Sequence, residues 1–135
     1  MKIYVSQYYD CIGYCLLGDK DQEYTSGAIN ASSKLEKSYL AAVEKTLFFI
    51  LANKPLYANT DPQIITDFKK DELNNRLNLE IENNPLVNKY KRTKNVNFSI
   101  KPALEKTDID SYYLTYTTNQ ARFFKMRNNN MQKGR

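Results

Sequence analysis

The sequence contains no histidine, and cysteine occurs only twice, at Cys11 and Cys15. A structural zinc ion needs four ligands, usually supplied by cysteine and histidine side chains. Two cysteines without any histidine cannot complete such a site, even though a spacing of four residues would place both on one face of a strand. We therefore predict that Cys11 and Cys15 are buried free thiols.

Long hydrophobic runs are also missing: no stretch approaches the ~18 consecutive apolar residues that a membrane-spanning helix requires. Residues 1–5 alternate as a strand does and do not resemble a signal peptide. Hydrophobic residues still make up 41% of the 135 residues, which is enough for one globular domain with a single core. The sequence therefore predicts an intracellular, cytoplasmic protein without a membrane partner.

Acidic residues are absent after Asp110, although the chain has 15 of them. Five of the 20 basic residues lie beyond that point, so the other 15 balance the acidic residues, and the last part of the chain accounts for the net charge of +5. On charge alone, a solubilising tail and a segment that binds phosphate are equally good interpretations. We expect residues 128–135 to form a basic, disordered tail that follows a domain of residues 1–127.

A second group of basic residues lies in a short segment that also contains a tyrosine. The group consists of Lys89, Lys91, Arg92 and Lys94. Clustered positive charge with interleaved aromatic residues is typical of surfaces that bind the phosphates of nucleic acids. We therefore treat these four residues as a candidate nucleic-acid-binding site.

The periodicity of the sequence predicts an α/β domain in which three strands come first. These strands cover residues 2–9, 13–17 and 23–29, and an amphipathic helix follows, from an N-cap at Ser32 or Ser33 to residue 52. The pattern beyond this helix predicts, in order, a strand at 56–60, a helix from Pro62 towards Lys69, a polar helical stretch at 71–84, a strand at 96–100 and a final helix from residue 108 to about residue 126.

Two acidic residues occupy unusual places in this pattern. Glu36 heads the apolar face of the long helix within its first turn, and Asp61 stands between the expected strand at 56–60 and the helix that begins at Pro62. These places predict that both carboxylates belong to one site. The alternatives are that Glu36 is favoured there by the helix dipole and that Asp61 caps the next helix.

The order of these elements, with acidic residues at these positions, resembles that of ribonuclease H. The segment from Ser32 to Glu36 is similar to the family's helix opening, and residues 59–65, Asn-Thr-Asp-Pro-Gln-Ile-Ile, are similar to its T-D-S-Q-x-V turn. A weaker similarity places the family's last acidic residue at Asp110, with Asp108 as the alternative. The resemblance implies a five-stranded mixed sheet, with three antiparallel strands followed by parallel strands, flanked by helices.

The resemblance also implies a catalytic site in which Glu36, Asp61 and Asp110 hold Mg²⁺ or Mn²⁺ and the enzyme hydrolyses RNA paired to DNA. Ser6 stands where the family has its first acidic residue, and a neutral hydroxyl cannot offset the repulsion between two metal ions. Asp10 could supply a metal ligand in its place only if the chain turns back towards the site.

These observations leave two functions open. The first is a divergent or weak metal-dependent ribonuclease that acts on RNA–DNA hybrids. The second is a catalytically inactive domain of the same fold, which binds a hybrid or a structured RNA through its basic residues or serves as a structural protein partner in a larger assembly. Ser6 favours the second function, and the three remaining acidic residues favour the first.

Overall fold

The computed structural model describes residues 1–31, 34–52 and 61–133. Within these ranges the chain forms five strands, four α-helices and one short 3₁₀ helix. The strands are β1 (Lys2–Tyr8), β2 (Cys11–Leu17), β3 (Glu23–Asn30), β4 (Gln63–Thr66) and β5 (Ser99–Ile100). The helices are α1 (Leu35–Ala52), α2 (Asp71–Glu82), α3 (Pro85–Lys94) and α4 (Asp108–Lys133), and the 3₁₀ helix covers Ala103–Glu105.

The strands form one mixed sheet in the order β3-β2-β1-β4-β5. β1 pairs antiparallel with β2, and β2 pairs antiparallel with β3, whereas β1–β4 and β4–β5 are parallel pairs. This arrangement confirms the predicted α/β layout of three antiparallel strands followed by parallel strands. Because β1 and β4 are parallel neighbours, their carboxyl ends lie at the same edge of the sheet.

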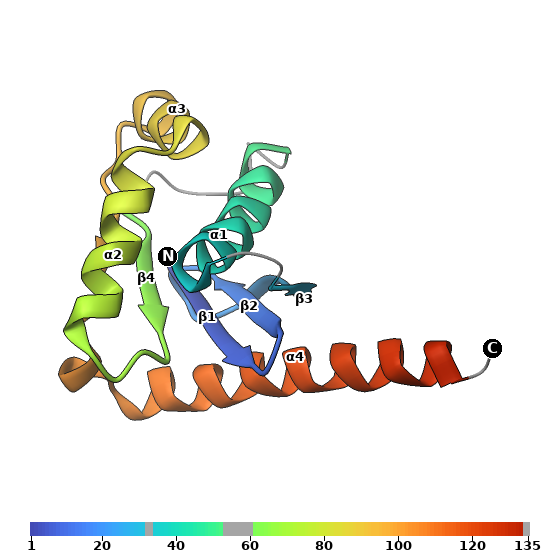
Figure 1. Ribbon diagram of the computed structural model, residues 1–135. Coiled ribbons are helices and arrows are strands. Elements are labelled where there is room, and N and C mark those ends of the chain that lie inside the picture. Colours follow the sequence, from blue (N-terminus) through green and yellow to red (C-terminus); the bar gives the residue numbers. More distant parts are fainter. Residues whose placement is uncertain (32–33, 53–60, 134–135) are drawn as a thin grey trace.

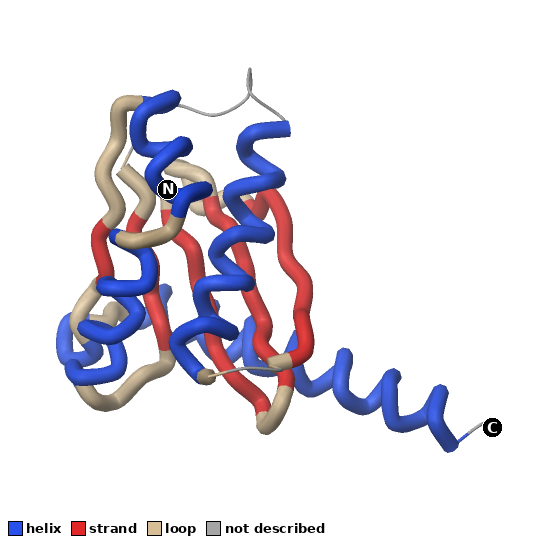
Figure 2. The backbone as a smooth tube through the Cα atoms, turned by 45° about the horizontal axis from the view of Figure 1, so that its top comes forward, coloured by secondary structure: helices blue, strands red, loops and turns tan. Residues whose placement is uncertain are grey.

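Helices cover both faces of the sheet (Figure 1). Ile3 and Val5 of β1 pack with residues of α1, α2 and α3 in the main core, while Tyr4 packs with Leu114 of α4 on the opposite face. Successive side chains of a strand point to opposite faces, so two helical layers are needed to bury both sets. α1 begins at the sheet edge where β1 and β4 end, and it runs back to the edge where they start (Figure 2).

The two cysteines confirm the prediction made for them. Cys11 and Cys15 are buried in β2 and form no disulfide. Burial, reinforced by the nearby Glu23 carboxylate, raises the pKa of the Cys15 thiol to about 12. Because the thiolate is the form that attacks electrophiles and binds metals, Cys15 is chemically inert at neutral pH and serves the packing of the sheet.

The segment after Pro62 differs from the prediction. The sequence predicts a helix here, but the chain forms β4 instead, so that prediction is wrong. Ile64 packs in the main core and Ile65 packs against α4 on the other face, an arrangement that consecutive residues reach only in a strand. Pro62 precedes the strand, where the sheet needs no N–H from it. The strand predicted at 56–60 lies outside the described residues.

The basic parts of the chain also differ from expectation. The segment with Lys89 to Lys94, for which the sequence predicts no element, is the helix α3. Asn84 caps this helix by accepting a hydrogen bond of 3.0 Å from the N–H of Val87, and Pro85 takes the first position. α4 is helical to Lys133, although the sequence predicts a disordered tail from residue 128. The cap expected at residues 32–33 lies outside the described part of the chain.

α4 lies directly against the backbone of β2 at Gly13. A Cβ atom at Gly13 would stand only 1.8 Å from the carbonyl oxygen of Thr117, so no other residue fits there without moving the helix. Ser6 pairs with Gly13 across β1 and β2, and its hydroxyl donates a hydrogen bond of 3.0 Å to the carbonyl of Leu114. Two small residues on adjacent strands therefore set the height of α4 above the sheet.

We predict that Gly13→Ala destabilises the protein by about 2 kcal/mol, because an added methyl group in a closely packed interface forces the backbone to shift. Urea unfolding would measure the change. Thr115→Ala is the matched control, since Thr115 is exposed on the same helix. Equal unfolding midpoints for the two variants would contradict the close approach of α4 to β2.

Candidate functional site

The sequence predicts a site at Asp61, after a strand at 56–60, whereas in the structure the carboxyl ends of neighbouring parallel strands are those of β1 and β4. Val5 of β1 is aligned with Thr66 of β4. The next residues, Ser6 and Asp67, therefore come to the same edge from neighbouring strands. Ligands of open α/β sheets commonly bind outside the carboxyl ends of parallel strands.

Asp67 is the carboxylate that the structure places at this edge. One oxygen of Asp67 accepts a hydrogen bond from the backbone N–H of Gln7 at 3.2 Å, and the other accepts one from the hydroxyl of Tyr39 in α1. Burial raises the pKa of Tyr39 strongly, and the charge of Asp67 raises it further. Tyr39 therefore remains protonated and donates to Asp67, which joins β1, β4 and α1.

Sequence reasoning missed Asp67 because it assigned the residues before it to a helix. The signal was present: Ile64, Ile65 and Thr66 are β-branched residues followed at once by an acidic residue. Such a run is typical of a buried strand, and an acidic residue directly after it lies at the carboxyl edge of the sheet. The proline at position 62 favoured the helical interpretation instead.

Asp61 and Glu36 lie at opposite ends of the sheet. Asp61 precedes β4, is exposed, and accepts a hydrogen bond of 3.0 Å from the N–H of Asn97. Glu36 is half-buried in the first turn of α1, the helix end that reaches Asp67 through Tyr39. An extended chain rises ~3.3 Å per residue, so Asp61 lies roughly 20 Å along the strand from Asp67. The structure does not bring Asp61 and Glu36 together.

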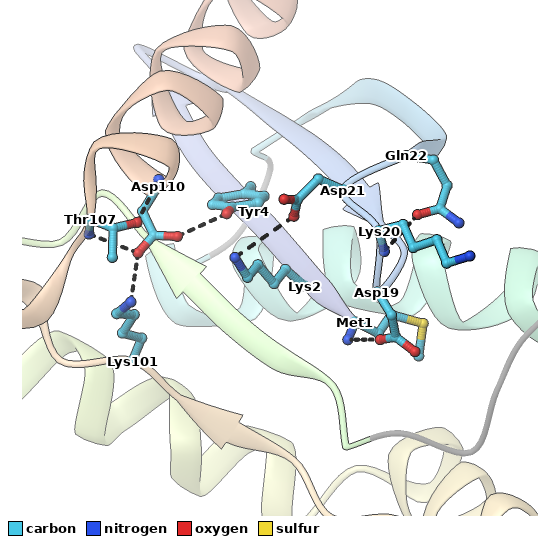
Figure 3. Close-up of polar contacts among 10 residues, drawn as sticks. All are labelled: Met1, Lys2, Tyr4, Asp19, Lys20, Asp21, Gln22, Lys101, Thr107 and Asp110. Atoms are coloured by element: carbon cyan, nitrogen blue, oxygen red, sulfur yellow. Dashed lines mark hydrogen bonds and ion pairs between the residues drawn. The ribbon is translucent and has the colours of Figure 1, made fainter.

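Asp110 is fully buried at the start of α4 and has three hydrogen-bonded partners (Figure 3). It accepts from the Tyr4 hydroxyl at 2.8 Å and from the N–H of Thr107 at 3.0 Å, and it forms an ion pair of 2.8 Å with Lys101. Burial alone would raise the pKa of Asp110, but these donors outweigh it and lower the pKa to about 2. The alternative residue, Asp108, is exposed in the same helical turn.

Ser6 and Asp10 are also engaged in internal contacts. Ser6 is fully buried, and its hydroxyl is hydrogen-bonded to Thr117 and Thr118 as well as to the helix backbone. An aspartate at position 6 would bring a charge against α4 rather than into an open site. Asp10 lies in the turn between β1 and β2 and pairs with Lys125 at 2.6 Å, which lowers the pKa of the Asp10 carboxyl.

These placements do not fit a pair of divalent metal ions. In the ranges 1–31, 34–52 and 61–133, no three acidic, cysteine or histidine side chains gather closely enough to hold one metal ion. Two ions about 3.5–4 Å apart would need several carboxylates to offset their repulsion. At the edge formed by β1 and β4, the carboxylate of Asp67 is already hydrogen-bonded, and Asp110 is neutralised by Lys101.

A pocket of about 390 Å³ opens beside Asp67. Its lining includes the apolar side chains of Leu104 and Leu114 and the polar side chains of Ser111 and Lys106. The Lys106 ammonium donates to the carbonyl of Phe68 at 3.2 Å, and burial lowers the pKa of this lysine. The pocket can therefore offer a ligand a carboxylate as hydrogen-bond acceptor and an ammonium and a hydroxyl group as donors.

The second candidate surface is the outer side of α3. Val87 and Tyr90 are buried in the main core, and the Tyr90 ring lies 5.6 Å from the ring of Phe98. This packing leaves Lys89 and Arg92 exposed, while Lys91 and Lys94 are half-buried. None of the four forms an ion pair with a carboxylate in the described part of the chain, so their charges are available to a partner.

Comparison with known proteins assigns no family to this chain: no model of a protein family matches it, and no curated protein is significantly similar to it. Within the described residues, no helix has the length and apolar character needed to cross a membrane.

We predict that Asp110→Asn destabilises the protein by about 2 kcal/mol at neutral pH and much less in acid. The pKa of Asp110 is lower in the folded protein, about 2, than its ordinary value of 3.8. Its charge therefore stabilises the fold above the unfolded pKa, and this contribution is lost as the pH falls towards 2.

Urea unfolding of the wild type and the variant at neutral and at acidic pH would test this expectation. Asp108→Asn is the matched control, because it makes the same chemical change at an exposed position of the same turn. A difference between wild type and Asp110→Asn that is the same at both pH values would contradict the role given to the charge.

Proposed function

We propose that the protein is a nucleic-acid-binding module with a ribonuclease H-like architecture that has lost hydrolytic activity. The observation that carries this proposal is the charge of α3: four basic side chains lie on one short helix, two of them exposed, without acidic partners among the described residues. Their charges favour a polyanion, because each lysine or arginine that meets a phosphate releases condensed counterions from the nucleic acid.

The order of the strands supports a relationship to ribonuclease H. A three-stranded antiparallel unit followed by parallel strands, flanked by helices, is the layout that the resemblance implies. Fold alone does not define activity, since one architecture carries many functions. Whether the protein is active therefore depends on the side chains at the carboxyl ends of β1 and β4.

Those side chains favour binding without hydrolysis. Ser6 and Asp110, which would correspond to the first and last acidic positions, are buried and hydrogen-bonded within the protein. Asp61 lies at the other end of the sheet. Asp67 is a single carboxylate at the carboxyl ends of β1 and β4. Metal-dependent phosphodiester hydrolysis requires a set of carboxylates around the ions.

The proposed partners are an RNA–DNA hybrid or a structured RNA, and the proposed location is the cytoplasm. Contacts between α3 and the phosphate backbone would position a nucleic acid without selecting its sequence. The two buried free thiols fit a reducing compartment. A structural role in a larger assembly is the outcome to accept if no nucleic acid binds.

We predict that changing Lys89, Lys91, Arg92 and Lys94 to alanine weakens binding to an RNA–DNA hybrid and flattens its salt dependence. Removing one basic side chain that meets a phosphate of a duplex should reduce the slope of log K against log salt by ~0.9. Fluorescence anisotropy with a labelled hybrid, measured over a series of salt concentrations, gives both the affinity and the slope.

In a control variant with the same change in net charge, alanine replaces four lysines that are exposed on other parts of the surface: Lys20, Lys34, Lys37 and Lys45. This variant should keep a slope close to that of the wild type. If both variants lose the same affinity, binding depends on the net charge of the protein and not on α3. Wild-type binding weaker than ~10⁻⁴ M would remove the nucleic-acid function altogether.

We also predict that the wild-type protein does not cleave an RNA–DNA hybrid in Mg²⁺ or Mn²⁺. The assay follows a labelled RNA strand on a denaturing gel. If cleavage occurs and is abolished in both Asp67→Asn and Glu36→Gln, the protein is a ribonuclease, and the edge of β1 and β4 is its active site. Cleavage that survives both substitutions would point to a contaminating nuclease.

A further inference from the structure

The carboxyl-terminal half of α4 extends past the β3 edge of the sheet (Figures 1 and 2). A helix of 26 residues is about 39 Å long, which exceeds the width of the sheet that it crosses. The helix carries no acidic residue after Asp110. Lys125 is neutralised by Asp10, whereas Arg127 forms no ion pair within the described residues.

A pocket of about 430 Å³ lies where this half of α4 leaves the sheet. This volume is within the range of ordinary small-molecule sites, ~300–1,000 Å³. Its wall is formed by one helix, and its floor is formed by β2 and β3. The lining residues are Gln120, Phe123, Phe124 and Arg127 of α4 with Tyr14, Gly27 and Ala28 of the strands.

The floor of the pocket lies close to the backbone of the sheet, because the residues of β3 that form it, Gly27 and Ala28, have no side chain larger than a methyl group. Ala28 pairs with Gly13, which faces α4, so the methyl group of Ala28 is on the same side of the sheet. Tyr14 packs against the main core on the other side of the sheet and also lines the pocket. A flat ring could therefore lie on the strands beneath the helix.

The wall combines aromatic rings with an exposed cation. The side chain of Phe123 is 65% exposed, which leaves most of its ring open to a ligand. Arg127 also lines the pocket, and its guanidinium lies 6.0 Å from the centre of the Phe124 ring. Aromatic rings stack on bases, and arginine pairs with phosphate, which is the combination found in sites for single-stranded nucleic acids.

We propose that this pocket binds one unpaired nucleotide, with the base stacked on Phe123 and the phosphate paired with Arg127. The inference rests on the proposed function and specifies it, because an unpaired nucleotide occurs in a single strand or in a loop of a structured RNA. A duplex does not fit the same site, since the faces of its bases are covered by their neighbours.

The first experiment compares a single-stranded RNA oligonucleotide with an RNA–DNA hybrid as ligands of the full chain. Base–aromatic stacking is worth about 1–3 kcal/mol, so Phe123→Ala should weaken single-strand binding roughly tenfold. Arg127→Gln should weaken it to a similar extent, because the guanidinium no longer pairs with the phosphate. Hybrid binding, which the proposed function assigns to α3, should stay within about twofold of the wild type.

The chain offers a matched control for each substitution. Arg122→Gln removes the same charge, and Met126→Ala removes an exposed apolar side chain, from positions of α4 that do not line the pocket. Both controls should bind the single strand as the wild type does. Ala28→Leu fills the floor from β3 without altering α4 and should reduce single-strand binding as strongly as Phe123→Ala.

A direct readout is available because the protein contains no tryptophan. Phe123→Trp keeps an aromatic face and introduces the sole indole, whose fluorescence a stacked base should quench. Titration with 5′-AMP and with an oligonucleotide separates the two sources of the nucleotide. The proposal expects quenching at much lower concentrations of the oligonucleotide than of 5′-AMP.

Four outcomes would overturn the inference. If Arg122→Gln weakens binding as much as Arg127→Gln, the helix contributes only general charge. If Phe123→Ala and Ala28→Leu leave single-strand binding unchanged while the α3 substitutions abolish hybrid binding, the pocket is excluded and the proposed function stands. If 5′-AMP quenches as well as the oligonucleotide does, the pocket is a site for a free nucleotide. Absence of binding to every nucleic acid would overturn both proposals.

Discussion

The buried carboxylate of Asp110 is the interaction on which the position of α4 depends. It joins the start of the helix to β1 through Tyr4 and to the segment after β5 through Lys101. A buried charge of this kind is tolerated only when it is paired and hydrogen-bonded, so that removing one partner destabilises the fold. α4 then crosses the sheet over small residues, so its angle and height are fixed before its exposed half begins.

This anchoring has a direct consequence for chemistry. A carboxylate that accepts from a lysine, a tyrosine and a backbone N–H has little capacity left for a metal ion, and its charge is already offset. The hydroxyl group of Ser6 is likewise engaged within the protein, because its hydrogen bonds hold β1 against α4. Positions that would carry hydrolysis in a ribonuclease H-like enzyme are used here to hold two layers together.

The sequence predicted the first half of the fold better than the second. β1 to β3 and α1 have clear periods and strong turn residues, and the structure confirms them. β4 was missed because Pro62 is a common helix start and four residues give little evidence of alternation. Because of that error, the acidic residue predicted directly after the fourth strand is Asp61, whereas Asp67 follows β4 in the structure. Asp110 was predicted as a site residue, but its burial against Lys101 could not be predicted, since it depends on an ion pair between separate segments.

The division of α4 into two halves explains how one helix can serve both stability and recognition. Its first half is held by Asp110, Ser6 and the close approach at Gly13, so it contributes to the free energy of unfolding. Its second half extends past the sheet and presents Phe123 and Arg127 to solvent. Substitutions in the second half should therefore have little effect on folding and should act on the proposed binding alone, because distant and independent contacts contribute additively. The rigid first half holds the exposed half in place, which lowers the entropic cost of ordering a binding surface when a partner arrives.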